Sequence, residues 1–391
     1  MRRGVQVITL VIGVIVGYAI AIVVTPGVVA PSVTPEPGER TAPPPTVTTS
    51  TTASVSTTSP APQPEIYLVW STGGLTPDLV EGLTENFSDL SVVRGDTVEL
   101  DTEGGWLVPL DGLGIDPEAH ASFDPGGSLV DLQPGTIVLG ETSSSFRGVG
   151  VGDALSISGT SYQIVGITPD EVVGAAEVVF SRADENAPVT TDRYALVRTE
   201  LERNEFESIV RDLYEGPAPL RIRSQEETPW MRHGDAVLPQ IFIKTALGEF
   251  SYSSRSGSEF SQDPAYVEAN IIDAEVPLLG PVTCHTTVVE MLRGAMNELI
   301  EAGLGHLVDP AGFAGCWNPR YIRATTGKPA GISRHAWGAA LDLNAASNPV
   351  GSAGTQDPRL VATMADWGFT WGGDWLVPDP MHFEYGIGPQ G

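Results

Sequence analysis

The 391-residue sequence is poor in basic residues and in cysteine. It has 21 Lys and Arg against 49 Asp and Glu, which gives a formal net charge of -28 at pH 7. So negative a surface repels phosphate backbones, which argues against a nucleic-acid partner and against binding to anionic lipid through a basic patch. The two cysteines, Cys284 and Cys316, are too few for a disulfide-framework protein. The length predicts two or three domains.

Long apolar runs are also scarce, and the clearest one lies at the amino terminus. Residues 4–24 are uncharged and mostly aliphatic, close to the ~20 residues that a helix needs to cross a bilayer core. Two arginines precede this run and no basic residue follows it before Arg40. We therefore expect residues 1–30 to form a cytoplasmic amino terminus and a transmembrane anchor, with the remainder exported. A cleaved signal peptide is the alternative, which Pro31 at the expected scissile bond disfavours.

Residues 31–64 consist almost entirely of Pro, Thr, Ser, Ala and Val. Such a segment has too little apolar surface to offset the entropy of ordering its backbone. We expect it to form an extended, solvated stalk whose hydroxyl groups are available for glycosylation.

The pattern over residues 65–227 predicts a β-rich α+β module with a ferredoxin-like sheet. Two strand–helix–strand units stand at its ends, and the stretch between residues 101 and 191 is inserted between them. Thr76 and Pro77 predict the N-cap and the first turn of one helix, and Thr199 with Glu202 forms a capping-box pattern before the other. The expected elements are strands 66–70, 90–100, 194–197 and 220–222, with one helix from Pro77 to Phe87 and a second that follows the capping box and runs to Leu213. Strands 136–139, 154–158 and 162–167 are expected in the insert.

Three short segments of the insert resemble the extracytoplasmic domain of MacB- and FtsX-like transporter permeases: 137–141 (IVLGE), 151–155 (VGDAL) and 163–167 (QIVGI). The resemblance covers residues 65–223 and implies a module that contacts a protein partner or acts as a spacer. Permeases of this kind have several membrane spans and this chain offers one, so transport does not carry over. The many carboxylates here are interpreted as a solvated face, with a cation or partner surface as the alternative.

Residues 228–391 carry the residues suited to metal chemistry. Ser333 to Asp342 reads SRHAWGAALD, and Asp379 to Glu384 reads DPMHFE. Residues 341–343 are expected to form a strand, with His335 in the loop that leads to it. A zinc ion that activates water needs three protein ligands and an open fourth position, and two imidazoles with one carboxylate supply that set. A further carboxylate that does not bind the metal is needed to move the proton, and Asp379 is the local candidate.

The pattern S-x-H-x-x-G-x-A-x-D followed by D-x-x-H resembles the VanY-type zinc D-alanyl-D-alanine carboxypeptidases, a family that includes L-alanyl-D-glutamate endopeptidases. The resemblance covers residues 236–386 and implies that His335, Asp342 and His382 bind zinc (Zn2+) and that Asp379 is the general base. It also implies an arginine that binds the substrate carboxylate or stabilises the oxyanion, because a guanidinium offers paired donors and a permanent charge. Arg320 occupies the expected place, and Arg323 competes with it for this role.

Other side chains in this segment have subsidiary roles. Glu384 is expected to orient the imidazole of His382, and Ser333 to lie in the substrate site near the first ligand. Trp337 and Trp375 are expected to line a substrate groove, with core packing as the alternative. Cys284 and Cys316 are expected to form a disulfide in an exported domain, with two buried thiols as the alternative.

Together these features predict an α+β zinc peptidase in a single-pass bacterial membrane protein, with the catalytic domain outside the cytoplasm. The expected substrates are peptidoglycan stem peptides, and D-alanyl-D-alanine carboxypeptidase activity is the first choice. An endopeptidase that cuts within the stem is one alternative. The other is a non-catalytic wall-binding or sensing protein that docks on a transporter-like partner.

Overall fold

The computed structural model describes residues 64–387 except 229, 236–237, 255–258 and 323–330. The anchor expected at residues 1–30 and nearly all of the expected stalk lie outside the described residues. Among the residues described, no helix is long and apolar enough to cross a membrane. All of them belong to one compact unit.

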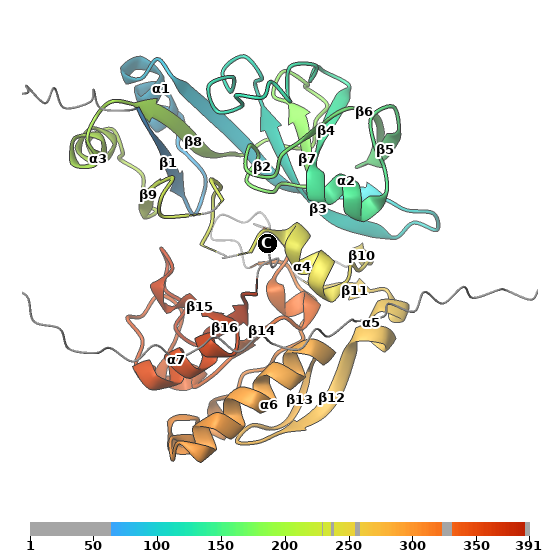
Figure 1. Cartoon of the computed structure of the whole chain (residues 1–391), viewed down its shortest axis with the longest axis vertical. Coiled ribbons are helices and arrows are strands. Elements are labelled where there is room, and N and C mark those ends of the chain that lie inside the picture. The colour runs from blue at the N-terminus through green and yellow to red at the C-terminus, as the bar shows by residue number, and fades with distance from the viewer. Residues whose placement is uncertain (1–63, 229, 236–237, 255–258, 323–330, 388–391) are drawn as a thin grey trace, which may run out of the picture. The chain divides into compact units, whose positions relative to one another are not determined.

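The two strand–helix–strand units predicted from the sequence share one antiparallel sheet, with strand order β2-β8-β1-β9. The helices α1 and α3 bury their apolar side chains in one cluster with this part of the sheet, and Figure 1 shows these helices beside it. This is the split arrangement expected for a ferredoxin-like sheet. The elements are β1 (Glu65–Ser71), α1 (Pro77–Asn86), β2 (Leu90–Asp101), β8 (Asp192–Thr199), α3 (Arg203–Asp212) and β9 (Leu220–Ser224).

The two helices begin differently. Thr76 is the N-cap of α1, where its hydroxyl accepts a hydrogen bond from the amide of Leu79, as predicted. The capping box predicted at Thr199 and Glu202 is wrong. Glu202 itself is the N-cap of α3, without a side-chain cap bond. Strand β8 continues to Thr199, whose hydroxyl instead accepts from the amide of Leu201 in the turn between strand and helix.

The insert extends the same sheet in the order β3-β7-β4-β6-β5, and β3 also pairs with β2. The pairs β3–β7 and β4–β6 are parallel. The pattern analysis identified β4, β5 and β6 but missed β3 and β7, which are buried along most of their length and therefore lack clear alternation. The elements are β3 (Leu107–Ile115), β4 (Thr136–Gly140), α2 (Glu141–Arg147), β5 (Ala154–Ile157), β6 (Thr160–Thr168) and β7 (Val178–Ser181).

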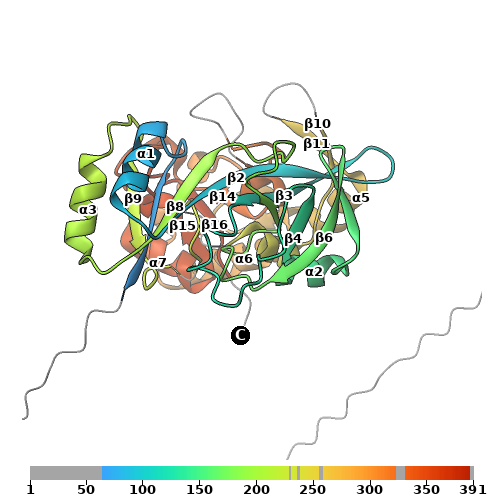
Figure 2. The same cartoon turned by 90° about the horizontal axis from the view of Figure 1, so that it is seen from above.

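The sheet continues past the boundary expected between residues 227 and 228. Strands β10 (Tyr252–Ser254) and β11 (Phe260–Gln262) pair with each other, and Tyr252 pairs with Leu107 of β3. The helix α4 (Gln240–Leu247) precedes them and is largely buried. Figure 2 shows β10 and β11 near the end of β3. The carboxy-terminal region is therefore joined to the module by backbone pairing.

The rest of the chain forms an α+β layer around a separate apolar core. A hairpin of β12 and β13 packs against α6, and a three-stranded antiparallel sheet of order β14-β16-β15 packs near α7. The strand predicted at residues 341–343 begins one residue earlier. The elements are α5 (Pro264–Asn270), β12 (Ile271–Val276), β13 (Gly280–His285), α6 (Thr286–Glu301), η3 (Arg334–Trp337), β14 (Ala340–Asp342), α7 (Pro358–Asp366), β15 (Phe369–Trp371) and β16 (His382–Tyr385).

Candidate metal centre

The structure brings together His335, Asp342 and His382. Each offers one ligand atom, and these atoms all lie within 4.8 Å of one another. Asp342 ends β14 and His382 begins β16, and the antiparallel register pairs these two residues directly. His335 comes from the 3-10 turn η3, after which Gly338 adopts a left-handed φ of 62° that lets the chain turn into β14.

The spacing of the three ligand atoms fits a tetrahedral metal ion. Nε2 of His335 lies 3.5 Å from Oδ1 of Asp342, and Nδ1 of His382 lies 3.2 Å from the same oxygen. Ligands ~2.0 to 2.1 Å from a tetrahedral zinc ion are about 3.3 Å from each other. Each of the two nitrogens therefore lies at about the distance from Oδ1 of Asp342 that a shared tetrahedral zinc ion requires.

The backbone fixes which nitrogen of His335 faces this centre. Nδ1 lies 2.7 Å from the carbonyl oxygen of Cys316, so the ring donates its proton there. Nε2 is buried and has no hydrogen-bond partner. Cys316 is held in turn by a disulfide to Cys284, with the two Cα atoms 5.4 Å apart. A buried imidazole with its lone pair unpartnered and its tautomer fixed is suited to bind a cation.

His382 lies between two carboxylates. Its Nδ1 faces Asp342, and its Nε2 lies 3.3 Å from Oε2 of Glu384, which is 3% exposed. Burial alone would lower the pKa of His382, but Asp342 and Glu384 outweigh it and raise the pKa to about 9. Burial likewise opposes ionisation of Asp342, yet its contacts with His335 and His382 hold its pKa well below the usual range. The surroundings favour positive charge at this position, and a divalent cation satisfies the same demand.

Asp379 lies beside the three ligand candidates without belonging to their cluster. Its backbone carbonyl accepts a hydrogen bond from the amide of His382, and its own amide donates to Gly372. Its Oδ1 is buried and has no hydrogen-bond partner. Burial raises the pKa of Asp379, and the charge of Asp342 adds to this effect, against the opposing charges of the histidines and Arg320. A carboxylate with a raised pKa and a free oxygen is a competent proton acceptor.

The positive charge of Arg320 acts on this carboxylate. It favours the ionised form of Asp379 and so opposes the rise in pKa that burial causes. Its carbonyl accepts a hydrogen bond from the amide of Ser333, and one guanidinium nitrogen lies 3.4 Å from the carbonyl of Tyr321. Ser333 is buried and is the N-cap of η3. Arg323, the competing candidate, lies outside the described residues.

The two tryptophans differ in position. Trp337 is 0% exposed and its ring lies 4.6 Å from that of Phe250, so it is a core residue. The groove-lining role expected for Trp337 does not fit a side chain without accessible surface. The ring of Trp375, in contrast, lies 5.1 Å from that of His382 and is partly exposed at the edge of the centre.

Two features of this centre were missed by sequence reasoning. The carbonyl of Cys316 fixes the tautomer of His335, and the neighbouring Arg334 is partly buried with its charge close to Glu384. A backbone carbonyl leaves no trace in the residue pattern, so the first had no sequence signal. Arg334 directly precedes the ligand candidate, but its burial depends on the tertiary structure.

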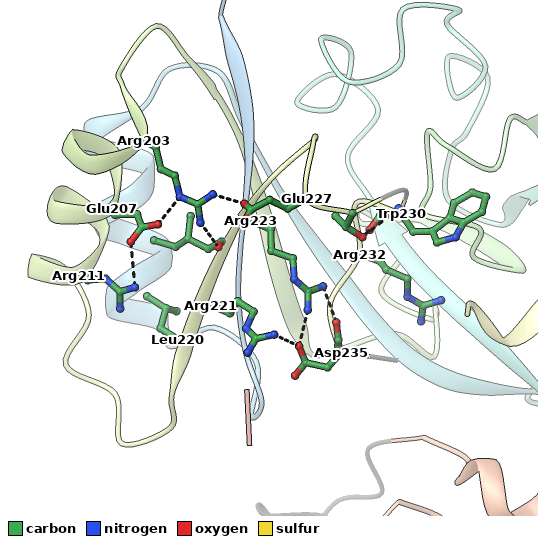
Figure 3. Close-up of a pocket in the computed structure, with 13 residues that line it drawn as sticks. Arg203, Glu207, Arg211, Leu220, Arg221, Arg223, Glu227, Trp230, Arg232 and Asp235 are labelled. Atoms are coloured by element: carbon green, nitrogen blue, oxygen red, sulfur yellow. Dashed lines mark hydrogen bonds and ion pairs between the residues drawn. The ribbon is translucent and has the colours of Figure 1, made fainter. Parts of the chain in front are cut away.

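A separate cavity of about 570 Å³ lies at β9 and the segment that follows it, and Figure 3 shows its side chains. Five arginines line it, with Glu207, Glu227 and Asp235 between them. Asp235 is the central acceptor: its Oδ1 lies 2.5 Å from nitrogens of Arg221 and of Arg223, and its Oδ2 accepts from the amide of Leu376 at 2.7 Å. Asp235 therefore holds the loop that carries the neighbouring Trp375.

Comparison with known proteins gives matches for two parts of the chain. The structure resembles the periplasmic region of MacB from Actinobacillus actinomycetemcomitans at 10% identity, covering 41% of this chain and 89% of that one with a TM-score of 0.31. A domain of a permease protein from Porphyromonas gingivalis is 15% identical, and the match covers 42% of this chain and 89% of that one with a TM-score of 0.27. The extracellular domain of the ABC-type transporter YknZ from Gram-positive bacteria is 10% identical, and the match covers 40% of this chain and 99% of that one with a TM-score of 0.28.

No curated protein sequence matches this chain. The carboxy-terminal residues do match a family model, and the matched segment contains every metal-ligand candidate together with Asp379. This match supports a peptidase role in general terms. Residues 326–385 are similar to the family described as D-alanyl-D-alanine carboxypeptidase.

Proposed function

We propose that the protein is a zinc peptidase that hydrolyses peptide bonds in the stem peptides of bacterial peptidoglycan. The observation that carries this proposal is the convergence of His335, Asp342 and His382 on one point beside Asp379. The family match over the same segment supports it. Two imidazoles and one carboxylate leave a fourth position open, which is the donor set of a catalytic zinc site.

Each residue of the centre has its own role in the proposed hydrolysis. His335, Asp342 and His382 would hold the zinc ion, which supplies Lewis-acid chemistry by making water acidic near neutral pH and by polarising a carbonyl group. Asp379 accepts a proton at Oδ1 from the attacking water and returns it to the leaving amine. Arg320 binds a substrate carboxylate or the developing oxyanion. Glu384 keeps the ring of His382 in place through Nε2.

The preferred reaction is removal of the terminal residue from D-alanyl-D-alanine. A carboxypeptidase needs a cation for the terminal carboxylate of its substrate, and Arg320 supplies one close to Asp379. An endopeptidase that cuts within the stem is the alternative. Zinc-loaded protein incubated with a synthetic stem pentapeptide distinguishes them by product mass. Loss of one alanine supports the carboxypeptidase, an internal cut supports the endopeptidase, and an intact peptide contradicts both.

The substitution Asp379→Ala tests whether the centre is catalytic. Turnover should fall by about 100-fold or more, the usual contribution of a positioned proton acceptor, with zinc content unchanged. Asp374→Ala is the matched control because that carboxylate lies exposed in the same loop. If the Asp379 variant loses turnover but keeps its biological activity in cells, a non-catalytic wall-binding or sensing protein is favoured.

We further propose that residues 1–30 anchor the protein in a bacterial membrane with the peptidase outside the cytoplasm. The module over residues 65–227 would then contact a protein partner, as its sequence resemblance to transporter domains suggests. Membrane fractionation combined with protease accessibility in intact cells tests the orientation. A carboxy-terminal tag found in the cytoplasm would contradict it.

A further inference from the structure

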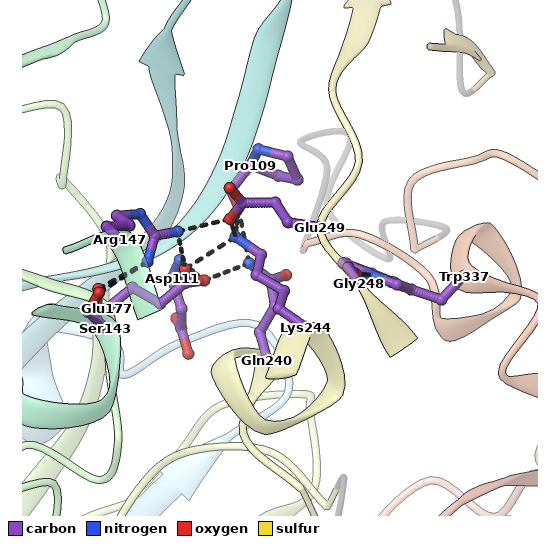
Figure 4. A network of polar contacts seen from close by, with 10 residues as sticks. All are labelled: Pro109, Asp111, Ser143, Arg147, Glu177, Gln240, Lys244, Gly248, Glu249 and Trp337. Carbon is purple, nitrogen blue, oxygen red and sulfur yellow. Dashed lines mark hydrogen bonds and ion pairs between the residues drawn. The ribbon is translucent and has the colours of Figure 1, made fainter. Parts of the chain in front are cut away.

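A buried charged network joins the helix α4 to the module. Lys244 and Glu177, the residue directly before β7, are both 0% exposed and lie 2.8 Å apart. Gln240, one turn earlier on α4, donates to the other oxygen of Glu177 at 2.7 Å. Arg147 lies 2.6 Å from Glu177 and from Glu249. Figure 4 shows the side chains of Arg147, Glu177, Gln240, Lys244 and Glu249 converging on one another.

The network fixes the position of α4 because its members depend on one another. Burial would raise the pKa of Glu177, but Lys244 and Arg147 outweigh it and hold the pKa below its usual value, so the carboxylate is ionised. Lys244 and Gln240 also donate to the carbonyl of Pro109 in β3. Both oxygens of Glu177 and the ammonium group of Lys244 are hydrogen-bonded, although Nε of Arg147 is buried without a partner. A buried charged pair with such bonds strongly restricts the arrangement of its side chains.

The two ends of α4 hold the residues on either side of His335. Before α4, the carbonyl of Leu238 accepts from the guanidinium of Arg334 at 2.7 Å. After α4, the carbonyl of Gly248 accepts from Nε1 of Trp337 at 3.2 Å. These bonds position the turn η3 at both of its ends.

A third contact to η3 comes from β11, at the edge of the extended sheet. Gln262 of β11 donates to the carbonyl of Ala336 at 2.7 Å. Three of the four residues of η3 are thus held by α4 or by β11, and both of these elements are attached to β3. The fourth residue is His335.

We propose that the module positions the metal centre, with Glu177, Gln240 and Lys244 as positioning residues that act on His335 through α4. None of the three belongs to the ligand cluster. The inference rests on the proposed function insofar as His335 binds zinc. It goes further because it makes the module a working part of the peptidase.

Two substitutions in the full-length protein test this coupling. Glu177→Gln removes the central charge, and Gln240→Met removes one neutral donor from the same network while keeping a helix-forming side chain of similar length. Zinc affinity is measured by competition with a chromogenic chelator. Hydrogen exchange of the amides of residues 334–338 is measured in the metal-free protein.

In Glu177→Gln, zinc affinity should fall about tenfold, in the range found when the support of a ligand is lost. Exchange of residues 334–338 should become faster. Gln240→Met should show the same changes to a smaller extent, and it remains available if Glu177→Gln does not fold. Zinc affinity and exchange within twofold of wild type in the folded variants would overturn the proposal.

Val210→Ala is the matched control, because Val210 is a fully buried residue of α3 in a different apolar cluster. It should lower the melting temperature without affecting zinc affinity or exchange at residues 334–338. If it weakens zinc binding as much as Glu177→Gln, the effect is general destabilisation and the proposal is wrong. Since neither readout uses a substrate, an absence of peptide cleavage would count against the proposed function alone.

Discussion

Replacement of Glu384 by Gln isolates the charge that supports His382. Glu384 is buried in β16, and Oε2 lies 3.3 Å from Nε2 of the imidazole. The amide oxygen of Gln can still accept the ring proton, so the orientation of the ring is kept while the negative charge is lost. Arg334, whose charge lies close to Glu384, would lose the same partner.

The expected effect follows from the role of such a partner. Loss of a group that supports a zinc-binding histidine costs 10- to 100-fold in metal affinity. We expect Glu384→Gln near the lower end, about tenfold or ~1.4 kcal/mol, because the hydrogen bond survives. Glu384→Ala removes the bond as well and should approach 100-fold, about 2.8 kcal/mol.

Zinc affinity measured by chelator competition at pH 7 checks this order. The control is Glu301→Gln, which removes an exposed carboxylate at the end of α6. Melting temperatures of the metal-free variants separate loss of the site from loss of the fold. Equal zinc affinities for wild type, Glu384→Gln and Glu384→Ala would refute the idea that Glu384 supports a ligand.

Three further predictions concern protonation and the loop near the centre. Because the pKa of metal-free His382 is about 9, zinc binding at pH 7 should release a proton from this ring. The apparent zinc affinity should rise up to about tenfold per pH unit toward pH 9. Calorimetry in buffers of different ionisation enthalpy counts the released protons, and a count of zero would contradict the assignment of His382 as a ligand. Burial lowers the pKa of His120, His233 and His285, so the unfolded chain binds more protons below pH 6.5. The free energy of unfolding of the metal-free protein should therefore fall from pH 6.5 to 5.5, by at most ~1.4 kcal/mol per pH unit for each ring. Chemical denaturation at the two pH values measures this change, and equal free energies would contradict the expectation. Asp235→Asn should weaken the hydrogen bonds that hold the loop at Leu376. It should raise KM more than it lowers zinc affinity, and an unchanged KM would contradict a role for this loop in substrate binding.

Local rules account for the elements that the sequence predicted correctly. Strands with an alternating pattern, such as β2 and β6, were recognised because one face is more buried than the other. The helix α1 was placed to within one residue because Thr76 and Pro77 give a start signal with a physical cause. β7 is buried at every position, so it has no alternation and was missed.

The candidate centre was accessible to sequence reasoning because its residues lie in two short motifs. Asp342 and His382 are 40 residues apart, yet the resemblance of their motifs to a zinc peptidase family implied one site, and the antiparallel register pairs them. For Trp337 the sequence left a groove-lining role and core packing open, and its burial favours core packing. An aromatic residue next to a ligand candidate fits a groove or a core equally well, and burial decides between them.

The support of the centre lies beyond any local signal. Lys244 is one of only two lysines in the chain, and in the sequence it stands alone in an apolar helix. Its partner Glu177 is 67 residues away, directly before β7, a strand that the pattern did not reveal. A lysine with no exposed surface must be neutralised by such a partner, because an unpaired buried charge would be too costly. The burial of Lys244 therefore requires a fixed contact between this helix and the module. The residues that flank the helix are hydrogen-bonded to Arg334 and Trp337, so the same contact helps to position the turn that carries His335.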